Sequence, residues 1–597
     1  MLSYRKLAMR VLGRPLHTGG GIDSPRPASQ RAAAFILTAA MLTTLAAPAF
    51  AGTWYIEDGN ITISAGTEAG TNKVEQVGKD TVNNDKDTVI TNREDKASSH
   101  TVTIETNDKN DTVEVTLKDV NIDASSRNNA AVSVTGSGNT TIKLDGDNAL
   151  KSDTYRSGIY GSGSLTISGG ENDSLTAQGG SGADGIYGSG SLTISGGTVT
   201  ANGDDGGRGI SSRGGVTISG GSTVTANGGN GTISGGDGIC SSGGVTISGG
   251  STVTANGGNG GSIGGGSGIY SNGSVTISGG TVTANGGKGG SGYGGDGIRS
   301  LDHVAISGGT VTANGGNSTN SSGGYGIISL DVAISSGTVT ANGGDSKDGY
   351  GGDGIHSNGV TISSGTVNAA GGYGGKVGGY GICSFDRVAI SGGTVEAAGG
   401  NGSTGGGSGI YSSVIDLSGS LELTAKAGSP TGKALLQNGR ELDLDTIKDK
   451  LGPGAKVTAT DANGDSKQVS GPRPVEPEEP VIPEESSSSS DGGSATPSAP
   501  VSPLPGLTVT DKDGQRISYT STQSGNTLTV CVGRLTASLH VSLAALRQLR
   551  AEGIETITFQ TILCSTTLSV DELLAMGGED AEAVLTHRLT DSSLTVG

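Results

Sequence analysis

The chain has 597 residues, of which 112 are glycine and only 3% are aromatic, so a compact aromatic core is excluded. The glycines follow no strict Gly-X-Y period, which excludes collagen, and short alternating runs of Val, Ile and Thr argue against plain disorder. The formal net charge of −19 disfavours nucleic acid and anionic membranes as partners.

Residues 1–51 have the pattern of a secretory signal peptide. A stretch rich in arginine precedes an apolar run from Ala32 to Pro48, and the tripeptide Ala49-Phe50-Ala51 follows. We expect cleavage after Ala51, which would leave a protein that is secreted or held at the cell surface, with no membrane insertion afterwards. An uncleaved N-terminal anchor is the alternative, although the apolar run is short for a membrane span.

Residues 153–426 are an internal repeat. Segments such as VTISGG and TVTANGG recur about every 28 residues, with a Gly-Ile dipeptide between them. Each repeat therefore holds three short strand-like pieces separated by glycine turns. A single repeat could not bury its own apolar side chains, so the repeats must stack. We predict an all-β fold, a right-handed parallel β-helix with three strands per coil and about ten coils.

Alternation along the strands predicts which side chains fill the interior of each coil. In one repeat, the residues expected inside are Val275, Ile277, Val282 and Ala284, and those expected outside are Thr276, Thr281 and Thr283. The glycine pairs Gly279-Gly280 and Gly286-Gly287 are expected to supply corners with positive φ. An asparagine recurs before one corner, where a hydrogen-bonded side-chain ladder is expected: Asn202, Asn227, Asn256, Asn285, Asn314 and Asn342.

The repeat is flanked by segments of different composition. Residues 52–152 are richer in charge and are predicted to be an N-terminal cap with irregular first coils, and residues 427–470 are predicted to close the rod. Residues 471–506 are rich in Pro, Ser and Glu, which is typical of a linker. Residues 507–597 are predicted to form a small α+β domain, and their sequence does not indicate its role.

Within that last domain we expect a helix near Ser542 to Glu552, stopped by Gly553, and a capping box from Ser569 to Glu572. Cys531 and Cys564 lie in this domain, and whether they pair is left open. Cys240 and Cys383 stand five coils apart, which at ~4.8 Å per coil is about 24 Å. A disulfide needs Cα atoms within about 7 Å, so these two cannot pair.

Three sequence features together resemble a family of secreted bacterial carbohydrate-binding β-helices, similar in fold to polysaccharide lyases. These are the segments Val113 to Ile122 and Thr140 to Leu144 and the VTISGGTVTA repeats that follow them. The resemblance covers about residues 52–426. It implies calcium-assisted binding of plant cell-wall polysaccharide without cleavage. It assigns no individual calcium ligands.

The position after each Gly-Ile isoleucine varies from coil to coil. Its residues are Tyr160, Tyr187, Ser211, Cys240, Tyr270, Arg299, Ile328, His356, Cys383 and Tyr411. A narrow interior would not accept Arg299 or His356, so this column faces outward. Tyr160 and Tyr187 lie on adjacent coils and would offer a flat face for sugar rings. The candidate carbohydrate-binding residues are therefore Tyr160, Tyr187, Tyr270 and Tyr411; alternatively, these tyrosines only cover strand edges.

A second column stands two residues before the same isoleucines. Its residues are Ser157, Asp184, Arg208, Asp237, Ser267, Asp296, Tyr325, Asp353, Tyr380 and Ser408. The aspartates lie two coils, about 10 Å, apart, too far for a hydrolytic pair or for one shared calcium ion. A solvated ladder with one cross-coil ion pair at Arg208 is the expected arrangement.

Metal binding has one candidate in the sequence. The segment from Gly179 to Ile186 fits the nonapeptide of calcium-binding β-rolls, which makes Asp184 a candidate calcium ligand and calcium a candidate cofactor. The motif occurs once and the period here is about three times longer, so the alternative is an ordinary glycine turn. The six histidines form no set with metal-ligand spacing.

The favoured hypothesis is a carbohydrate-binding or adhesive protein without catalytic activity, with a polysaccharide or surface glycan as partner. A self-associating structural rod is the first alternative. A polysaccharide lyase or hydrolase is the second, and it would need carboxylates with Arg or Lys on adjacent coils of one face. Outward threonine columns also fit an ice-binding surface, although threonine is simply a good exposed strand residue. The sequence does not identify the ligand, the organism or the mode of attachment.

Overall fold

The structure of the chain, a computed structural model, describes residues 52–472 and 506–596, the latter with gaps at 512–513, 518, 525, 533–535, 562–564, 577–581 and 588–591. The predicted signal peptide and most of the predicted linker lie outside the described residues. So does Cys564, and the question of its pairing with Cys531 stays open. The chain divides into two compact units, residues 1–478 and 479–597, and each is described by itself.

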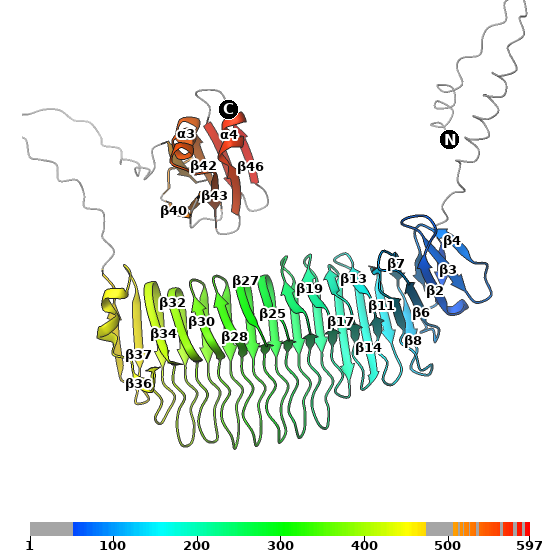
Figure 1. Cartoon of the computed structure of the whole chain (residues 1–597), viewed down its shortest axis with the longest axis horizontal. Helices are drawn as coiled ribbons and strands as arrows, with labels where there is room; N and C mark the ends of the chain where they lie inside the picture. The colour runs from blue at the N-terminus through cyan, green and yellow to red at the C-terminus, as the bar shows by residue number, and fades with distance from the viewer. Residues whose placement is uncertain are drawn as a thin grey trace, which may run out of the picture. The chain divides into compact units, whose positions relative to one another are not determined.

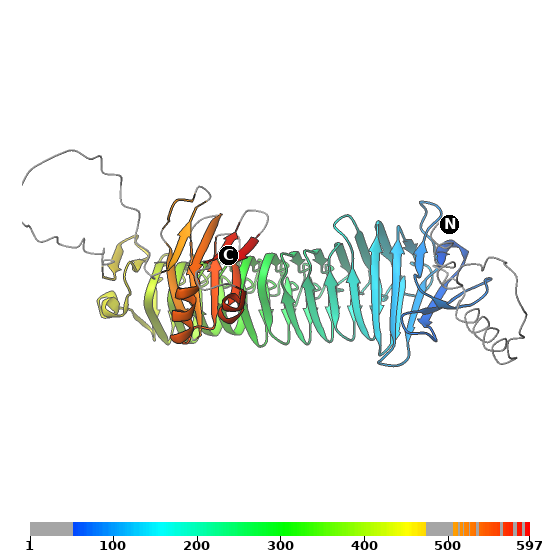
Figure 2. The ribbon, with the colours of Figure 1, turned by 90° about the horizontal axis from the view of Figure 1, so that it is seen from above.

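The first unit is a parallel β-solenoid (Figure 1). Each turn contributes three strands, and each strand pairs in parallel with its counterpart one turn on, as Thr252–Asn256 pairs with Thr281–Asn285. Seen from above, the broad strands lie side by side along the axis of the solenoid (Figure 2). Strand makes up 53% of the structure and helix only 5%, which confirms the predicted fold class.

Three faces run along the solenoid. The first face carries the VTIS strands β1 (Thr53–Tyr55), β5 (Val89–Thr91), β7 (Thr112–Lys118), β10 (Asn139–Asp145), β13 (Ser164–Ser168), β16 (Leu192–Ser195), β19 (Gly215–Ser219), β22 (Gly244–Ile247), β25 (Val275–Asn285), β27 (His303–Asn314), β28 (Ile327–Ile334), β30 (Ile355–Ile362), β32 (Ile382–Ala398) and β34 (Val414–Lys426). Several of these strands are long because they turn a corner without a break and continue onto a neighbouring face.

The second face carries the TVTAN strands and the last parts of β25, β27, β32 and β34. Its own strands are β8 (Asn121–Asp123), β11 (Asp147–Lys151), β14 (Ser174–Ser181), β17 (Thr198–Asp204), β20 (Thr223–Asn227), β23 (Thr252–Asn256), β29 (Thr338–Asn342), β31 (Thr366–Ala370) and β37 (Lys456–Thr460).

The third face carries the strands that begin at the Gly-Ile isoleucines and the first parts of β28, β30 and β32. Its own strands are β2 (Ile61–Ala65), β6 (Val102–Thr106), β9 (Val132–Gly136), β12 (Ile159–Gly161), β15 (Ile186–Gly188), β18 (Ile210–Ser212), β21 (Ile239–Ser241), β24 (Ile269–Ser271), β26 (Ile298–Ser300), β33 (Ile410–Ser412) and β35 (Leu435–Gln437).

The solenoid has about 15 turns, so the prediction of about ten coils was too low. The difference lies at the two ends. β1 already pairs in parallel with β5, and β35 and β37 still continue the third and second faces. These end turns keep the buried apolar positions but replace the VTISGG and TVTANGG strings by charged and irregular sequence, which hides their periodicity.

Short antiparallel strands and 3₁₀ turns close the two ends. β3 (Asn72–Gln76) and β4 (Val82–Asp85) add to β2 at the first end, where η1 (Ile56–Asp58) also lies. At the other end β36 (Arg440–Glu441) pairs with β35, β38 (Ser466–Ser470) pairs with β37, and η2 (Leu444–Lys450) lies between them in sequence. Antiparallel hairpins satisfy edges that a further parallel turn would otherwise have to cover.

The interior is narrow and aliphatic, as the alternation predicts. Val275, Ile277, Val282 and Ala284 are all fully buried, whereas the threonines between them are exposed or half-buried. The asparagine ladder is also confirmed, because each Nδ2 donates to Oδ1 of the asparagine one turn before it, at 2.8 Å in every step from Asn227 to Asn342.

The loops between the second and third faces stack as regularly as the strands. They form the row of green and yellow loops along the lower side of the solenoid in Figure 1. Gly280 has the expected positive φ, of +83°, but the second pair has no positive φ, either at Gly286 or at Gly287. A Cβ atom at Gly287 would instead lie 1.9 Å from the carbonyl oxygen of Gly258 one turn away. Glycine at that position allows adjacent loop backbones to approach closely.

The described residues of the second unit form two four-stranded sheets and two helices. One sheet consists of β39 (Leu507–Thr510), β42 (Ala537–Ser542), β45 (Glu582–His587) and β46 (Ser592–Val596). The other consists of β40 (Thr520–Ser524), β41 (Thr527–Cys531), β43 (Thr556–Gln560) and β44 (Ser565–Ser569). The predicted helix is α3 (Leu543–Ala551), capped by the Ser542 hydroxyl, and α4 (Val570–Met576) follows the predicted capping box. No helix among the described residues is long and apolar enough to span a membrane.

Candidate functional site

The candidate site is the corner at which each loop enters a strand of the third face. Two side chains per turn, one on each side of the Gly-Ile dipeptide, line this corner from Ser157 and Tyr160 to Ser408 and Tyr411; we call this set the corner row. The position after the isoleucine faces outward, as predicted, because the isoleucines themselves are fully buried. Exposure varies along the row: Tyr160 is 41% exposed, whereas Cys383 and Ser408 are buried.

Tyr160 and Tyr187 form a stacked pair on adjacent turns. Their ring centroids are 5.3 Å apart and the ring planes differ by 12°, which confirms the predicted juxtaposition. The register of β12 and β15 places them opposite each other. Both rings line a cavity of about 430 Å³, whose wall also includes Tyr155 and Arg156. This cavity therefore combines a flat aromatic surface with a cationic hydrogen-bond donor.

The other two candidate tyrosines lie elsewhere along the corner row. Tyr270 packs beside Arg299, whose guanidinium carbon is 5.9 Å from the ring centroid. Tyr411 stacks on Tyr380 at 5.2 Å and 18°. The structure thus brings Tyr160 and Tyr187 together and leaves Tyr270 and Tyr411 as separate points on the same row.

The aspartates of the corner row are not a solvated ladder, contrary to expectation. Asp296 and Asp353 are each only 6% exposed. Each aspartate accepts, through Oδ1, a hydrogen bond from the backbone N–H of the equivalent residue one turn on. These donors are Arg208 to Asp184 at 2.7 Å, Ser267 to Asp237 at 2.8 Å, Tyr325 to Asp296 at 2.8 Å and Tyr380 to Asp353 at 2.7 Å. The carboxylates thus join successive loops.

The second oxygen of three of these carboxylates also has a partner. The expected cross-turn ion pair is present, with Arg208 Nε 3.5 Å from Asp237 Oδ2. Arg299 reaches Asp296 Oδ2 at 3.1 Å, and His356 Nδ1 lies 2.7 Å from Asp353 Oδ2. Burial raises the pKa of the carboxyl groups of Asp184 and Asp237, and hydrogen bonds to them oppose that rise only in part.

The raised pKa of Asp184 predicts a specific pH dependence of stability. The folded chain binds this proton more tightly than the unfolded chain, whose aspartate has a pKa of about 3.9. The contribution of the group to stability is therefore full below that pH and is lost as the pH rises through the folded-state pKa. Asp184→Asn keeps the acceptor for Arg208 but does not titrate.

We expect the free energy of unfolding of the unmodified chain, relative to that of Asp184→Asn, to fall as the pH rises above about 4 and then to level off. Urea unfolding at a series of pH values measures this difference. A difference that is constant with pH, or one that grows as the pH rises, would contradict the raised pKa.

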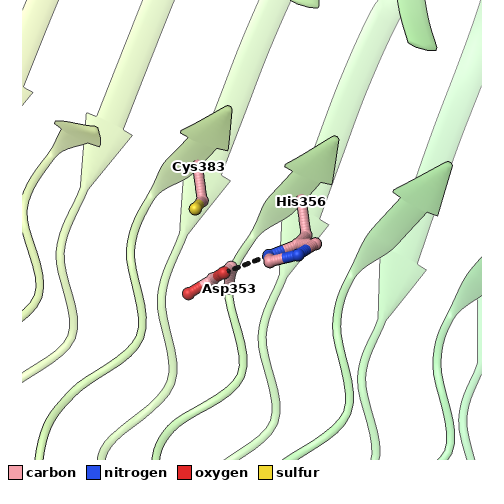
Figure 3. Close-up of side chains that lie close together, drawn as sticks. All are labelled: Asp353, His356 and Cys383. Atoms are coloured by element: carbon pink, nitrogen blue, oxygen red, sulfur yellow. Dashed lines mark hydrogen bonds and ion pairs between the residues drawn. The ribbon is translucent and has the colours of Figure 1, made fainter. Parts of the chain in front are cut away.

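One group of potential metal ligands lies in the corner row. Asp353, His356 and Cys383 each offer a ligand atom, and these atoms lie within 4.8 Å of one another (Figure 3). Within the described part of the chain, no other group of three or more His, Cys, Asp or Glu side chains is close enough to hold a metal ion. Sequence spacing hides it, because Cys383 follows His356 by a whole coil and meets it only through the register of β30 and β32. The group could have been found by comparing each aspartate of the second column with the residue of the first column on the next turn.

Asp184, the residue expected to bind calcium, is not part of this group. Its Oδ1 is occupied by the backbone N–H of Arg208, and the positive charge of Arg208 lies nearby. Calcium prefers six to eight oxygen ligands. The calcium site at Asp184 stays a prediction, and the hydrogen bond indicates the structural role that this aspartate shares with the others.

The cysteines of the solenoid are free, as their positions predict. The chain matches no family model, no curated protein and no solved structure.

Proposed function

We propose that this chain is a secreted or cell-surface protein that binds a polysaccharide or surface glycan along the corner row and does not cleave it. The observation that carries the proposal is the stacked pair Tyr160 and Tyr187 in a cavity with Arg156. The apolar face of a sugar ring can lie on such a tyrosine surface, while a guanidinium donates hydrogen bonds to hydroxyl or carboxylate groups.

A second cavity on the same row supports binding of an extended polymer. It has a volume of about 420 Å³ and is lined by Tyr293, Asp296, Arg299 and Tyr325, among others. Arg299 brings a guanidinium to this cavity and is held there by its contact with Asp296 Oδ2 at 3.1 Å. Two cavities of similar chemistry along one rigid row suit a chain-like ligand better than a single small molecule.

The carboxylates of the row argue for binding rather than hydrolysis. A general acid or base needs an oxygen that can reach the substrate. In Asp237, Asp296 and Asp353 both oxygens already have partners within the protein. Arg208 does lie beside Asp237, as a lyase or hydrolase would require, but this pair serves to join adjacent turns.

The test is binding of the purified chain to a panel of neutral and acidic polysaccharides, with calcium and with a chelator. We expect Tyr160→Ala combined with Tyr187→Ala to weaken binding at least about tenfold, or about 1.4 kcal/mol, because the flat surface is removed. Replacing both residues by phenylalanine keeps the stacked rings and should retain most of the affinity. Isothermal titration calorimetry or affinity electrophoresis gives the comparison.

Tyr373→Ala is the matched control. This tyrosine is 46% exposed and does not line either of the two cavities, so its loss should leave the affinity unchanged. Equal effects of the double variant and the control would place binding away from the cavity with the stacked tyrosines. If no polymer binds, the proposal fails and a self-associating structural rod becomes the better hypothesis. Release of reducing ends would favour an enzyme instead.

A further inference from the structure

We propose that Asp353, His356 and Cys383 form a binding site for a zinc ion. The three residues come from two successive turns, with Asp353 and His356 on one and Cys383 on the next. Figure 3 shows the three side chains close together, with Asp353 in contact with His356 and the Cys383 sulfur beside them. The inference goes beyond polysaccharide binding and does not depend on it.

The ligand set suits zinc. Zinc binds thiolate, imidazole and carboxylate, whereas calcium and magnesium take oxygen ligands almost exclusively. All three potential ligand atoms lie within 4.8 Å of one another, and Asp353 Oδ2 is 2.7 Å from His356 Nδ1. Bonds of about 2.0 to 2.1 Å from a tetrahedral zinc ion would separate these two atoms to about 3.3 Å. This pair therefore needs only a small side-chain movement.

Asp353 differs from the other buried aspartates of the row in the group that compensates its charge. Asp237 is paired with Arg208 and Asp296 with Arg299. The ion-pair partner of Asp353 in the structure is His356, which carries a charge only when protonated. A buried carboxylate needs a compensating cation, and a metal ion bound to neutral His356 would supply it.

The surroundings hold the ligands in orientation. The His356 ring stacks on Tyr325, with centroids 4.4 Å apart, and meets the edge of Phe385 at 5.2 Å. The backbone N–H of Tyr380 holds the other oxygen of Asp353 at 2.7 Å. Such supporting contacts reduce the cost of ordering a metal site.

Binding would replace the thiol proton of Cys383 by the metal and release that proton to solvent. Three protein ligands leave a fourth position for water or an external ligand.

Cobalt(II) titration of the full chain, purified without a histidine tag, tests the site. Co²⁺ replaces Zn²⁺ in such sites and reports a thiolate ligand by a charge-transfer absorption band. We expect one equivalent to produce that band and added Zn²⁺ to abolish it. Cys383→Ser should remove the band, and His356→Gln should weaken Co²⁺ binding at least about tenfold.

Cys240→Ser is the matched control, because Cys240 occupies the same column beside an aspartate but has Arg208 nearby and no histidine on its turn. The control should retain the band. Absence of a thiolate band, a band that survives Cys383→Ser, or a band lost equally in Cys240→Ser would overturn the proposal.

Discussion

Replacing Gly287 by alanine should destabilise the solenoid by about 3 kcal/mol or more, which is the upper part of the range for overpacking. The added Cβ would lie 1.9 Å from the carbonyl oxygen and 2.5 Å from the carbonyl carbon of Gly258 on the adjacent turn. Both atoms belong to the backbone, which is itself held by hydrogen bonds to the neighbouring turns, so no flexible side chain can move aside. The loop that contains Gly287 and the loop that contains Gly258 would have to move apart.

Gly279→Ala in the same turn is the control. A Cβ atom there meets nothing within 4 Å, and the φ angle of Gly279 is not in the left-handed region. This variant should be neutral or more stable by about 0.4 to 1 kcal/mol, because alanine restricts the unfolded chain. Urea unfolding followed by circular dichroism measures both variants. Similar free energies of unfolding for the two would show that adjacent loops do not need this close approach.

Ile277→Ala should cost about 2 to 5 kcal/mol, the usual range for removing a large aliphatic side chain from a core. Ile277 is fully buried and stacks in register between Ile247 and Ile306 of the neighbouring turns. The interior is only as wide as a few side chains, so a cavity there removes contacts with the turns on both sides. A solenoid has no distant contacts that could compensate for this loss.

Ile263→Ala provides the comparison for Ile277→Ala. Ile263 is 64% exposed in a loop of the same region, and its truncation should change the free energy of unfolding by no more than about 0.5 kcal/mol. Both substitutions remove the same side-chain atoms. The difference between the two losses in free energy of unfolding, measured under identical conditions, therefore reports the effect of burial in the interior. A loss at Ile277 as small as that at Ile263 would contradict a close-packed interior.

The repeat alone predicted the strands, the buried faces and the asparagine ladder, since these follow from periodicity. It missed several turns at the ends of the solenoid. The turns that contain β1 and β37 keep apolar residues at the buried positions but lack the repeated glycine corners, so sequence comparison within the chain does not find them. At the ends, a turn is recognised by the parallel hydrogen bonds between its strands and those of the next turn. No local sequence pattern predicts these bonds.

The candidate site also has features that the sequence predicted and features that it did not. The stacking of Tyr160 on Tyr187 was predictable, because both occupy one column and a coil advances by one strand spacing. The burial of Asp296 and Asp353 was not, since a column of acidic residues on an outward position is usually solvated. Their burial depends on how far the stacked glycine loops fold over the corner.

For this protein, the sequence by itself determined the fold class, the inward and outward faces of each strand, and which residues share a column, because all three depend on a period that is written in the chain. Only the tertiary structure decided how many turns stack, which aspartates lose solvent, and that Asp353 and His356 meet Cys383. Those outcomes depend on contacts between different columns on successive turns. Such contacts are set by the path of the loops, and glycine-rich loops carry little side-chain information about their path.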